Sequence, residues 1–140
     1  MLQELSPEEK SEWLQLYRSE NVGPITFKNL MNYYETPAEA LRHLSEFALR
    51  GGRRKEISIC SKNAAQKEMS DTANIGGQLI AICEPDYPAL LRLVEDAPPI
   101  ITVLGSKALL NKKCVGVVGT RNASLNGKNM ARRLAFDLCQ

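Results

Sequence analysis

The sequence of 140 residues lacks the patterns of several common protein classes. Its four cysteines, Cys60, Cys83, Cys114 and Cys139, are widely separated, so the chain has no CxxC pair and no zinc-ligand spacing. No apolar run approaches the roughly 18 residues that span a bilayer, and the acidic, polar N-terminus has no signal-peptide core. We therefore expect a cytoplasmic protein with reduced thiols and no contact with a membrane.

Strong net charge and paired catalytic groups are also absent. The net charge of +2 and the pI of about 8.4 are too close to neutral to indicate nucleic-acid binding, so a basic function must come from local clustering. The single histidine, His43, has no evident partner, and nothing pairs the acids near Asp86 and Asp96 as a general acid and base. The chain contains neither GxGxxG nor GxxxxGK[ST]. We expect no catalytic residue, no metal ligand and no cofactor.

Residues 1–75 are predicted to form an all-helical domain of four short helices. Ser6 followed by Pro7 and two glutamates is typical of a helix start, as is Thr36 followed by proline. The chain breaks at residues 21–24, and a second helix is expected from about residue 26. A fourth helix is expected over residues 61–72. The aromatic residues of this domain fall on helical stripes and are therefore expected in its core: Trp13, Tyr17, Tyr33 and Tyr34.

Residues 76–140 are predicted to form the first part of an α/β domain. Short apolar runs at 78–83, 100–104 and 114–118 predict strands, and a helix is expected from about 126 to 140. The third run has no polar residue, which is typical of a strand buried on both faces of a parallel sheet. Two or three strands and one full helix cannot bury a doubly wound sheet. We therefore expect that this chain is a fragment, or that its sheet depends on residues outside it.

The turn between the third predicted strand and the last helix is predicted to bind phosphate. Gly119 lets the chain leave the strand sharply, and the free N–H groups at the helix start form an anion site. Arg121 adds a planar guanidinium that grips phosphate through two hydrogen bonds, and two hydroxyl side chains add donors. A plain turn with a solvated arginine is the alternative. The candidate binding residues are Gly119, Thr120, Arg121, Ser124, Gly127 and Lys128.

Two further segments have weaker signals for nucleic-acid binding. The glycine-containing break at residues 21–24 would present backbone N–H groups to a DNA phosphate, but it lacks basic residues until Lys28, so a structural helix–helix turn explains it better. The segment 50–55 has four positive charges in six residues, a pattern that could contact nucleic acid but is more commonly a solvated loop.

Several blocks in order resemble the DNA-processing protein A family (DprA, also called Smf). That family shows a YPxLL segment, a D-x-PP strand entry and a VGSR-x-x-S-x-x-G turn at similar spacing. Here the blocks read DYPALL at 86–91, DAPPI at 96–100 and VVGTRNASLNG at 117–127. Thr120 replaces the more frequent serine, and Asn126 stands where an aromatic residue is common. The resemblance implies a sterile-alpha-motif-like or helix-hairpin-helix-like domain followed by the beginning of a Rossmann-like domain.

The same resemblance implies a function. It implies a bacterial protein without catalytic activity that binds single-stranded DNA, helps to load the recombinase RecA in natural transformation, and forms a homodimer. Arg121 matches the family arginine that contacts the DNA backbone, and the glycines and hydroxyl residues around it match positions that shape the turn. We expect the dimer surface and half of the DNA pocket to lie in residues that this chain lacks. We therefore expect the chain alone to bind single strands weakly.

Two other classes of function remain open. A nucleotide-processing hydrolase of the Rossmann-like kind would need a GGxGT-type loop with a catalytic Arg–Glu set, and these 140 residues contain no such loop. A protein-interaction module would use the N-terminal helices to bind a partner protein, with the α/β segment as scaffold.

Overall fold

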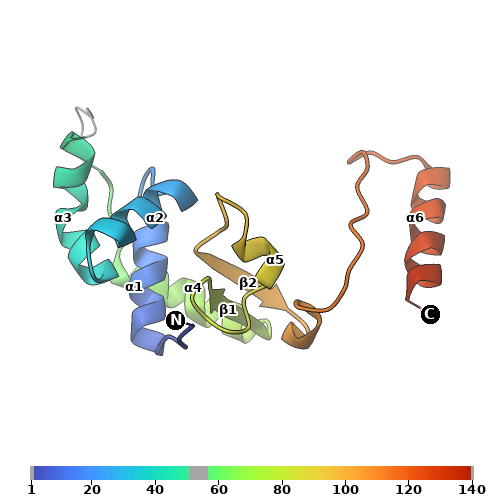
Figure 1. Ribbon diagram of the computed structural model, residues 1–140, viewed down its shortest axis with the longest axis horizontal. Helices are drawn as coiled ribbons and strands as arrows, with labels where there is room; N and C mark the ends of the chain where they lie inside the picture. Colours follow the sequence, from blue (N-terminus) through green and yellow to red (C-terminus); the bar gives the residue numbers. More distant parts are fainter. Residues whose placement is uncertain (1, 51–56, 140) are drawn as a thin grey trace.

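The computed structural model describes residues 2–50 and 57–139, and it places an all-helical part before a small α/β part (Figure 1). This arrangement confirms the predicted fold class. The described elements are α1 (Pro7–Tyr17), α2 (Pro24–Tyr33), α3 (Pro37–Arg50), α4 (Lys62–Asn74), β1 (Gly77–Ala81), α5 (Ala89–Arg92), β2 (Ile100–Leu104), the 3-10 helix η1 (Lys107–Leu109) and α6 (Leu125–Leu138).

The helices begin where local capping chemistry places them. The Ser6 hydroxyl oxygen accepts a hydrogen bond from the Glu9 N–H at 3.3 Å, and the Glu9 carboxylate accepts one from the Ser6 N–H at 2.8 Å. These bonds lower the pKa of the Glu9 carboxyl below its usual value. Ser61 caps α4 through its side chain alone, with its hydroxyl oxygen 3.1 Å from the Ala64 nitrogen. The predicted helix starts are thus confirmed, although α2 begins at Pro24, two residues early.

The core of the helical part is built from the predicted apolar stripes of α1, α2 and α3. Trp13 and Tyr17 pack around Phe27, with ring centroids 5.0 and 6.2 Å from the Phe27 centroid. Tyr33 is 65% exposed, so its predicted place in the core is wrong. It lies at the C-terminal end of α2 and packs edge-on against Tyr34. Most of the predicted basic loop, residues 51–55, lies outside the described residues. The buried residues of this core are Leu16, Val22, Phe27, Leu30, Ala40 and Leu44.

The two strands form an antiparallel pair, with Gly77 opposite Leu104 and Ala81 opposite Ile100. One face of the pair packs on α1 and α4 through a second core cluster, while α5 contributes to a third cluster on the other face. The half-buried side chain of Trp13 contacts both the helical core and the second cluster. The second cluster consists of Leu14, Ala65, Leu79, Ala81 and Ile100. The helical part and the sheet therefore share buried side chains.

The predicted buried strand at 114–118 is wrong for the structure of this chain. The segment pairs with neither β1 nor β2, and Val118 is 96% exposed. Cys114 is exposed as well, although the sequence predicts a buried thiol, while Cys83 is half-buried. A strand buried on both faces needs neighbours on both edges, and the described part of the chain places none beside this segment.

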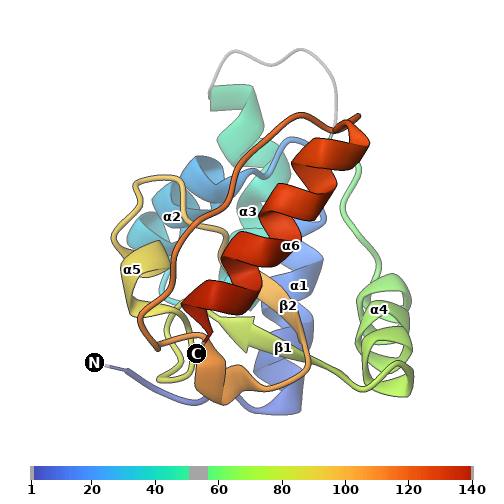
Figure 2. The same ribbon diagram turned by 90° about the vertical axis from the view of Figure 1, so that its right-hand side faces the viewer.

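Helix α6 stands apart from the remaining elements at the end of this extended segment (Figure 1). Figure 2 views the molecule from the side of α6, so that this helix lies in front of the other elements. None of its residues is buried. The large apolar side chains of α6 are 45% or more exposed: Leu125, Met130, Leu134, Phe136 and Leu138. Helix α6 is therefore held by its own backbone hydrogen bonds and cap rather than by a core.

Candidate nucleic-acid interface

The N-terminus of α6 is capped by one of the predicted site residues. The Ser124 hydroxyl oxygen accepts a hydrogen bond from the Gly127 N–H at 3.2 Å, and the Lys128 N–H donates to the Ser124 carbonyl at 3.0 Å. The hydroxyl hydrogen of Ser124 stays free to donate to a ligand. The backbone N–H groups of Leu125 and Asn126 have no acceptor within the described residues, so the first turn of α6 leaves donors for an anion.

The two predicted glycines of the turn have room around them. A Cβ atom at Gly119 would meet no atom within 4 Å, and one at Gly127 would lie 3.6 Å from the Ser124 hydroxyl oxygen. Neither glycine has a φ in the left-handed region. The local backbone therefore does not require glycine at either position, and the space beside Gly119 is open.

The charged side chains of the turn face solvent. Thr120, Arg121 and Lys128 are exposed, and neither cation forms an ion pair within the part of the chain that the structure describes. The six predicted residues lie together because they occupy one ten-residue turn and helix start, residues 119–128. No second element of the described chain adds a side chain to them. The arrangement offers two free backbone donors, hydroxyl groups and a free guanidinium, which suits a phosphate group.

A charge pattern that the sequence analysis missed surrounds this turn. No acidic residue occurs between Asp96 and Asp137, whereas seven basic residues do. Residues 1–96 have a net charge of −4, and residues 97–140 have +6. Counting acids in windows along the chain would have found this asymmetry, which the total charge of +2 conceals. The seven basic residues are Lys107, Lys112, Lys113, Arg121, Lys128, Arg132 and Arg133.

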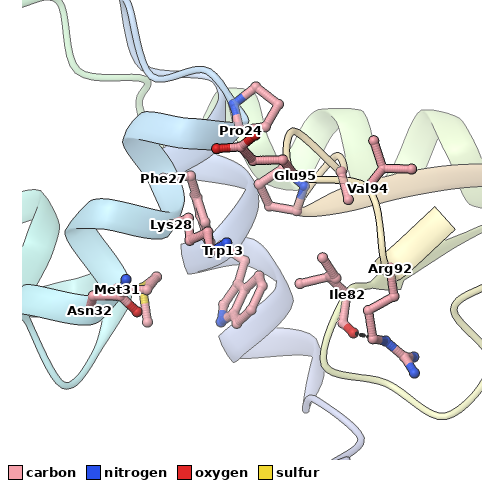
Figure 3. A pocket seen from close by; sticks show the side chains of 12 residues that line it. Trp13, Pro24, Phe27, Lys28, Met31, Asn32, Ile82, Arg92, Val94 and Glu95 are labelled. Carbon is pink, nitrogen blue, oxygen red and sulfur yellow. Dashed lines mark hydrogen bonds between the residues drawn. The ribbon is translucent and has the colours of Figure 1, made fainter. Parts of the chain in front are cut away.

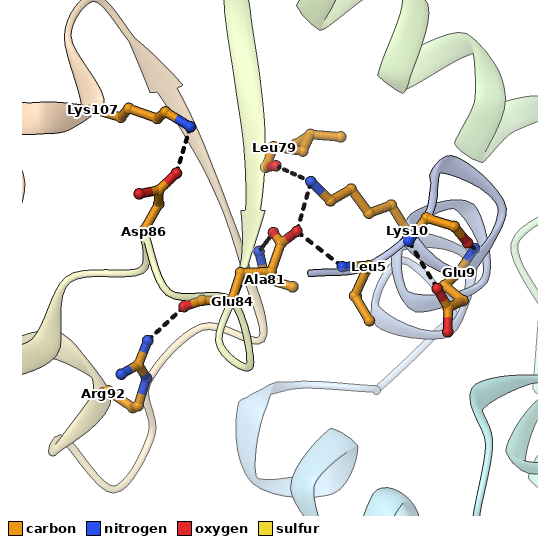
Figure 4. Close-up of polar contacts among 10 residues, drawn as sticks. Leu5, Glu9, Lys10, Leu79, Ala81, Glu84, Asp86, Arg92 and Lys107 are labelled. Carbon is orange, nitrogen blue, oxygen red and sulfur yellow. Dashed lines mark hydrogen bonds and ion pairs between the residues drawn. The ribbon is translucent and has the colours of Figure 1, made fainter. Parts of the chain in front are cut away.

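Two of these cations have partners. Lys107 forms an ion pair with Asp86, and this contact raises the pKa of Lys107 above its usual value (Figure 4). Arg133 lies 3.9 Å from Asp137 on the exposed side of α6. The other five basic side chains of this region are without an acidic partner among the described residues, so they are available to an external polyanion.

The DYPALL and DAPPI blocks contribute to the packing around α5 and add no side chain to the turn at residues 119–128. The Arg92 guanidinium donates to the carbonyl oxygens of Ile82 at 2.8 Å, Glu84 at 2.7 Å and Tyr87 at 3.3 Å. The Tyr87 ring is fully buried, its hydroxyl donates to the Pro98 carbonyl at 2.8 Å, and burial raises its pKa. These contacts fix the loops on either side of α5. Sequence reasoning missed Arg92, because nothing local indicates which carbonyl oxygens it reaches.

Within residues 2–50 and 57–139, no group of three His, Cys, Asp or Glu side chains is arranged to hold a metal ion. Within those residues no helix combines the length and apolar character needed to cross a membrane.

Comparison with known families identifies the relationship. A model described as the DprA-like N-terminal HHH domain matches residues 7–70, and a model described as DNA recombination-mediator protein A matches residues 78–140. The chain belongs to the DprA/Smf family. The second match begins inside β1, so the α/β part is the beginning of the Rossmann-like domain of this family.

Two curated DprA/Smf proteins show the extent of the similarity. The DNA processing protein DprA of Bacillus subtilis is 33% identical over 66 residues, which are 46% of this chain and 22% of that protein. Protein Smf of Synechocystis sp. is 26% identical over 137 residues, which are 91% of this chain and 34% of that protein. The chain thus spans between about a fifth and a third of the length of these relatives.

Proposed function

We propose that this part of a DprA/Smf protein binds the phosphate backbone of single-stranded DNA at the turn between Gly119 and Lys128. The observation that carries the proposal is the acid-free, basic stretch from residue 97 to 136, which has this exposed turn within it. Backbone N–H groups, hydroxyl groups and a guanidinium read phosphate and not base identity, so the binding is independent of sequence. The protein acts without catalysis, in the cytoplasm.

The single-stranded form of the DNA is supported by the resemblance of the VVGTRNASLNG block to the family turn. We also propose that the complete protein, as a homodimer, delivers the bound strand to RecA in natural transformation. The description of the matching family as a recombination mediator supports this role.

A salt titration with a matched arginine control tests the site. The affinity of the 140-residue chain for a fluorescently labelled oligothymidylate is measured by anisotropy at several salt concentrations. We expect a Kd above about 1 µM at physiological salt, and Arg121→Ala is expected to weaken binding about three- to tenfold and to make the log–log salt slope shallower by about 0.7. Arg42→Ala, which removes an exposed arginine of α3, is expected to change neither value.

Equal affinities of the chain and its Arg121→Ala variant would contradict the assignment of the turn. Submicromolar binding by the unchanged chain at physiological salt would contradict the expectation that these residues form only part of the DNA site.

A further inference from the structure

A cavity of about 220 Å³ lies between the helical part and the loops of the α/β part, away from the turn at 119–128. Side chains of α1 and α2 form one side, and residues from the end of β1 to the start of β2 form the other (Figure 3). Neither part of the chain forms this cavity alone. Ligand sites of proteins occur preferentially in such positions between structural units.

Trp13 provides a flat aromatic wall in the middle of the cavity (Figure 3). Its ring is held in place by Phe27, whose centroid lies 5.0 Å away at an interplanar angle of 48°, and by contact with two core clusters. The indole N–H has no acceptor among the described residues. An aromatic face that is fixed and still reachable is the feature on which proteins stack planar rings.

Three polar side chains without partners surround this aromatic wall. Lys28, Asn32 and Glu95 are exposed, line the cavity, and make no hydrogen bond or ion pair within the described part of the chain. Arg92 also lines the cavity, but its guanidinium is held by three backbone carbonyl oxygens and acts as a fixed positive charge. A ligand that satisfies all of them needs an anionic group for Lys28 and N–H groups for the Glu95 carboxylate.

The cavity is smaller than the roughly 300–1,000 Å³ of sites for drug-sized ligands, so it admits a single planar ring system. A nucleotide combines the required groups: a base that stacks on Trp13, a base edge that hydrogen-bonds to Asn32 and Glu95, and a phosphate that pairs with Lys28. We propose that this cavity holds one nucleobase, whose phosphate lies outside it and pairs with the exposed Lys28. The proposal goes beyond backbone binding at the turn, which involves no base recognition.

The fluorescence of Trp13, the single tryptophan of the chain, reports directly on this cavity. The chain is titrated with the four deoxynucleoside monophosphates and with deoxyribose 5-phosphate, and N-acetyltryptophanamide corrects for absorption of light by the ligand. Saturable quenching is expected for nucleotides and not for the sugar phosphate, because only a base stacks on the indole ring.

Variants of the exposed polar residues separate specific binding from general quenching. Lys28→Gln is expected to raise the Kd for nucleotides about fivefold by removing the cation that pairs with phosphate. Glu95→Gln is expected to change the ratio of affinities among the four bases about threefold or more, because it changes the hydrogen-bonding groups that face the base edge. Lys112→Gln, a lysine that does not line the cavity, is the matched control and leaves all constants unchanged. Circular dichroism confirms the fold of each variant.

An oligonucleotide and its abasic counterpart of equal length distinguish the source of the base. If the oligonucleotide quenches Trp13 and its abasic counterpart does not, the cavity binds a nucleotide within single-stranded DNA. If the monophosphates quench Trp13 and neither strand does, the cavity binds free nucleotides. The proposal is overturned if no nucleotide quenches Trp13 saturably. It is also overturned if Lys28→Gln leaves the Kd for nucleotides unchanged. A protein partner would then be the occupant to consider. Binding of oligothymidylate that depends on Arg121 would survive that outcome, so the two proposals fail separately.

Discussion

At the scale of single residues, the Glu84 carboxylate joins the N-terminal helices to the sheet (Figure 4). Its side chain is 6% exposed and lies 2.9 Å from the Lys10 ammonium group. It also accepts hydrogen bonds from the Leu5 N–H at 3.2 Å and the Ala81 N–H at 2.7 Å. Lys10 in turn donates to the Leu79 carbonyl at 3.1 Å. A buried carboxylate is stabilising only when all of its donors are present. Removing the carboxylate is costly, because it leaves buried donors without an acceptor.

We predict that Glu84→Ala lowers the free energy of unfolding by about 3 kcal/mol, because it leaves the buried Ala81 N–H without its acceptor and the Lys10 ammonium group without its anionic partner. The Lys10 side chain is 23% exposed, and its hydration keeps the loss below that of a fully buried pair. Urea denaturation followed by Trp13 fluorescence measures the change. Asp86→Ala, which removes an exposed ion pair with Lys107, is expected to cost less than about 1 kcal/mol. Equal costs would show that Glu84 has no special role.

At the scale of elements, the sequence predicts the features that neighbouring residues determine, such as the first residues of the helices. Ser6 and Ser61 cap their helices through side chains three residues away from the N–H groups they bind, so the sequence is sufficient to place α1 and α4. Strand pairing is not local. The apolar residues of 114–118 are typical of a strand, but only a neighbouring strand makes them one, and here they remain exposed.

The same distinction applies to the two candidate sites. The turn proposed to bind phosphate is continuous in sequence, so its residues can be grouped from their spacing alone, and the structure places Ser124 as the N-cap of α6. The cavity at Trp13 combines side chains of α1 and α2 with residues that lie 50 or more positions further along the chain. The sequence therefore predicts that Trp13 is an ordinary core residue. Only the packing of the helical part against the α/β part shows that its ring is half-buried and lines a cavity.

The exposure of the segment 114–118 predicts the chemistry of its cysteine. Cys114 and Cys139 are exposed, whereas Cys83 is half-buried and burial raises its pKa above that of a free thiol. Because the thiolate is the reactive form, we predict that iodoacetamide at neutral pH alkylates Cys114 about tenfold or more faster than Cys83. The rate at Cys83 is expected to rise with pH until the pH passes its raised pKa. Peptide mass spectrometry at timed intervals measures both rates, with Cys139 as the internal standard for exposure. A Cys114 as slow as Cys83 would indicate a buried strand.

At the scale of the whole molecule, the net charge changes sign near residue 96, whereas buried side chains join residues on both sides of residue 75. The acidic part, residues 1–96, contains most of the buried core, and the basic part from residue 97 onward adds β2 to that core and then presents an exposed turn and helix. The second core cluster crosses the predicted domain division near residue 75, since Leu14 and Ala65 precede it and Leu79 and Ile100 follow it. The division into domains stays a prediction, but the helices and the sheet are physically coupled through this cluster.

This coupling predicts that the helical part and the sheet unfold together. Leu14 is completely buried among residues of α4, β1 and β2, so Leu14→Ala is expected to cost about 3 kcal/mol in free energy of unfolding through lost contacts and a cavity. Trp13 fluorescence reports on the helices, and pulsed alkylation of Cys83 reports on the end of the sheet. Both urea midpoints are expected to coincide in the original chain and to fall equally in the variant.

Leu138→Ala on α6 is the control for this prediction, since its side chain is 57% exposed and its loss is expected to move neither midpoint by a measurable amount. Separate midpoints for Trp13 and Cys83 would show that the helical part folds on its own and that the shared cluster is only a contact between two independent domains. In that case the cavity at Trp13 would open and close with the contact. Nucleotide quenching of Trp13 would then disappear at the urea concentration where the two parts separate, before the helices themselves unfold.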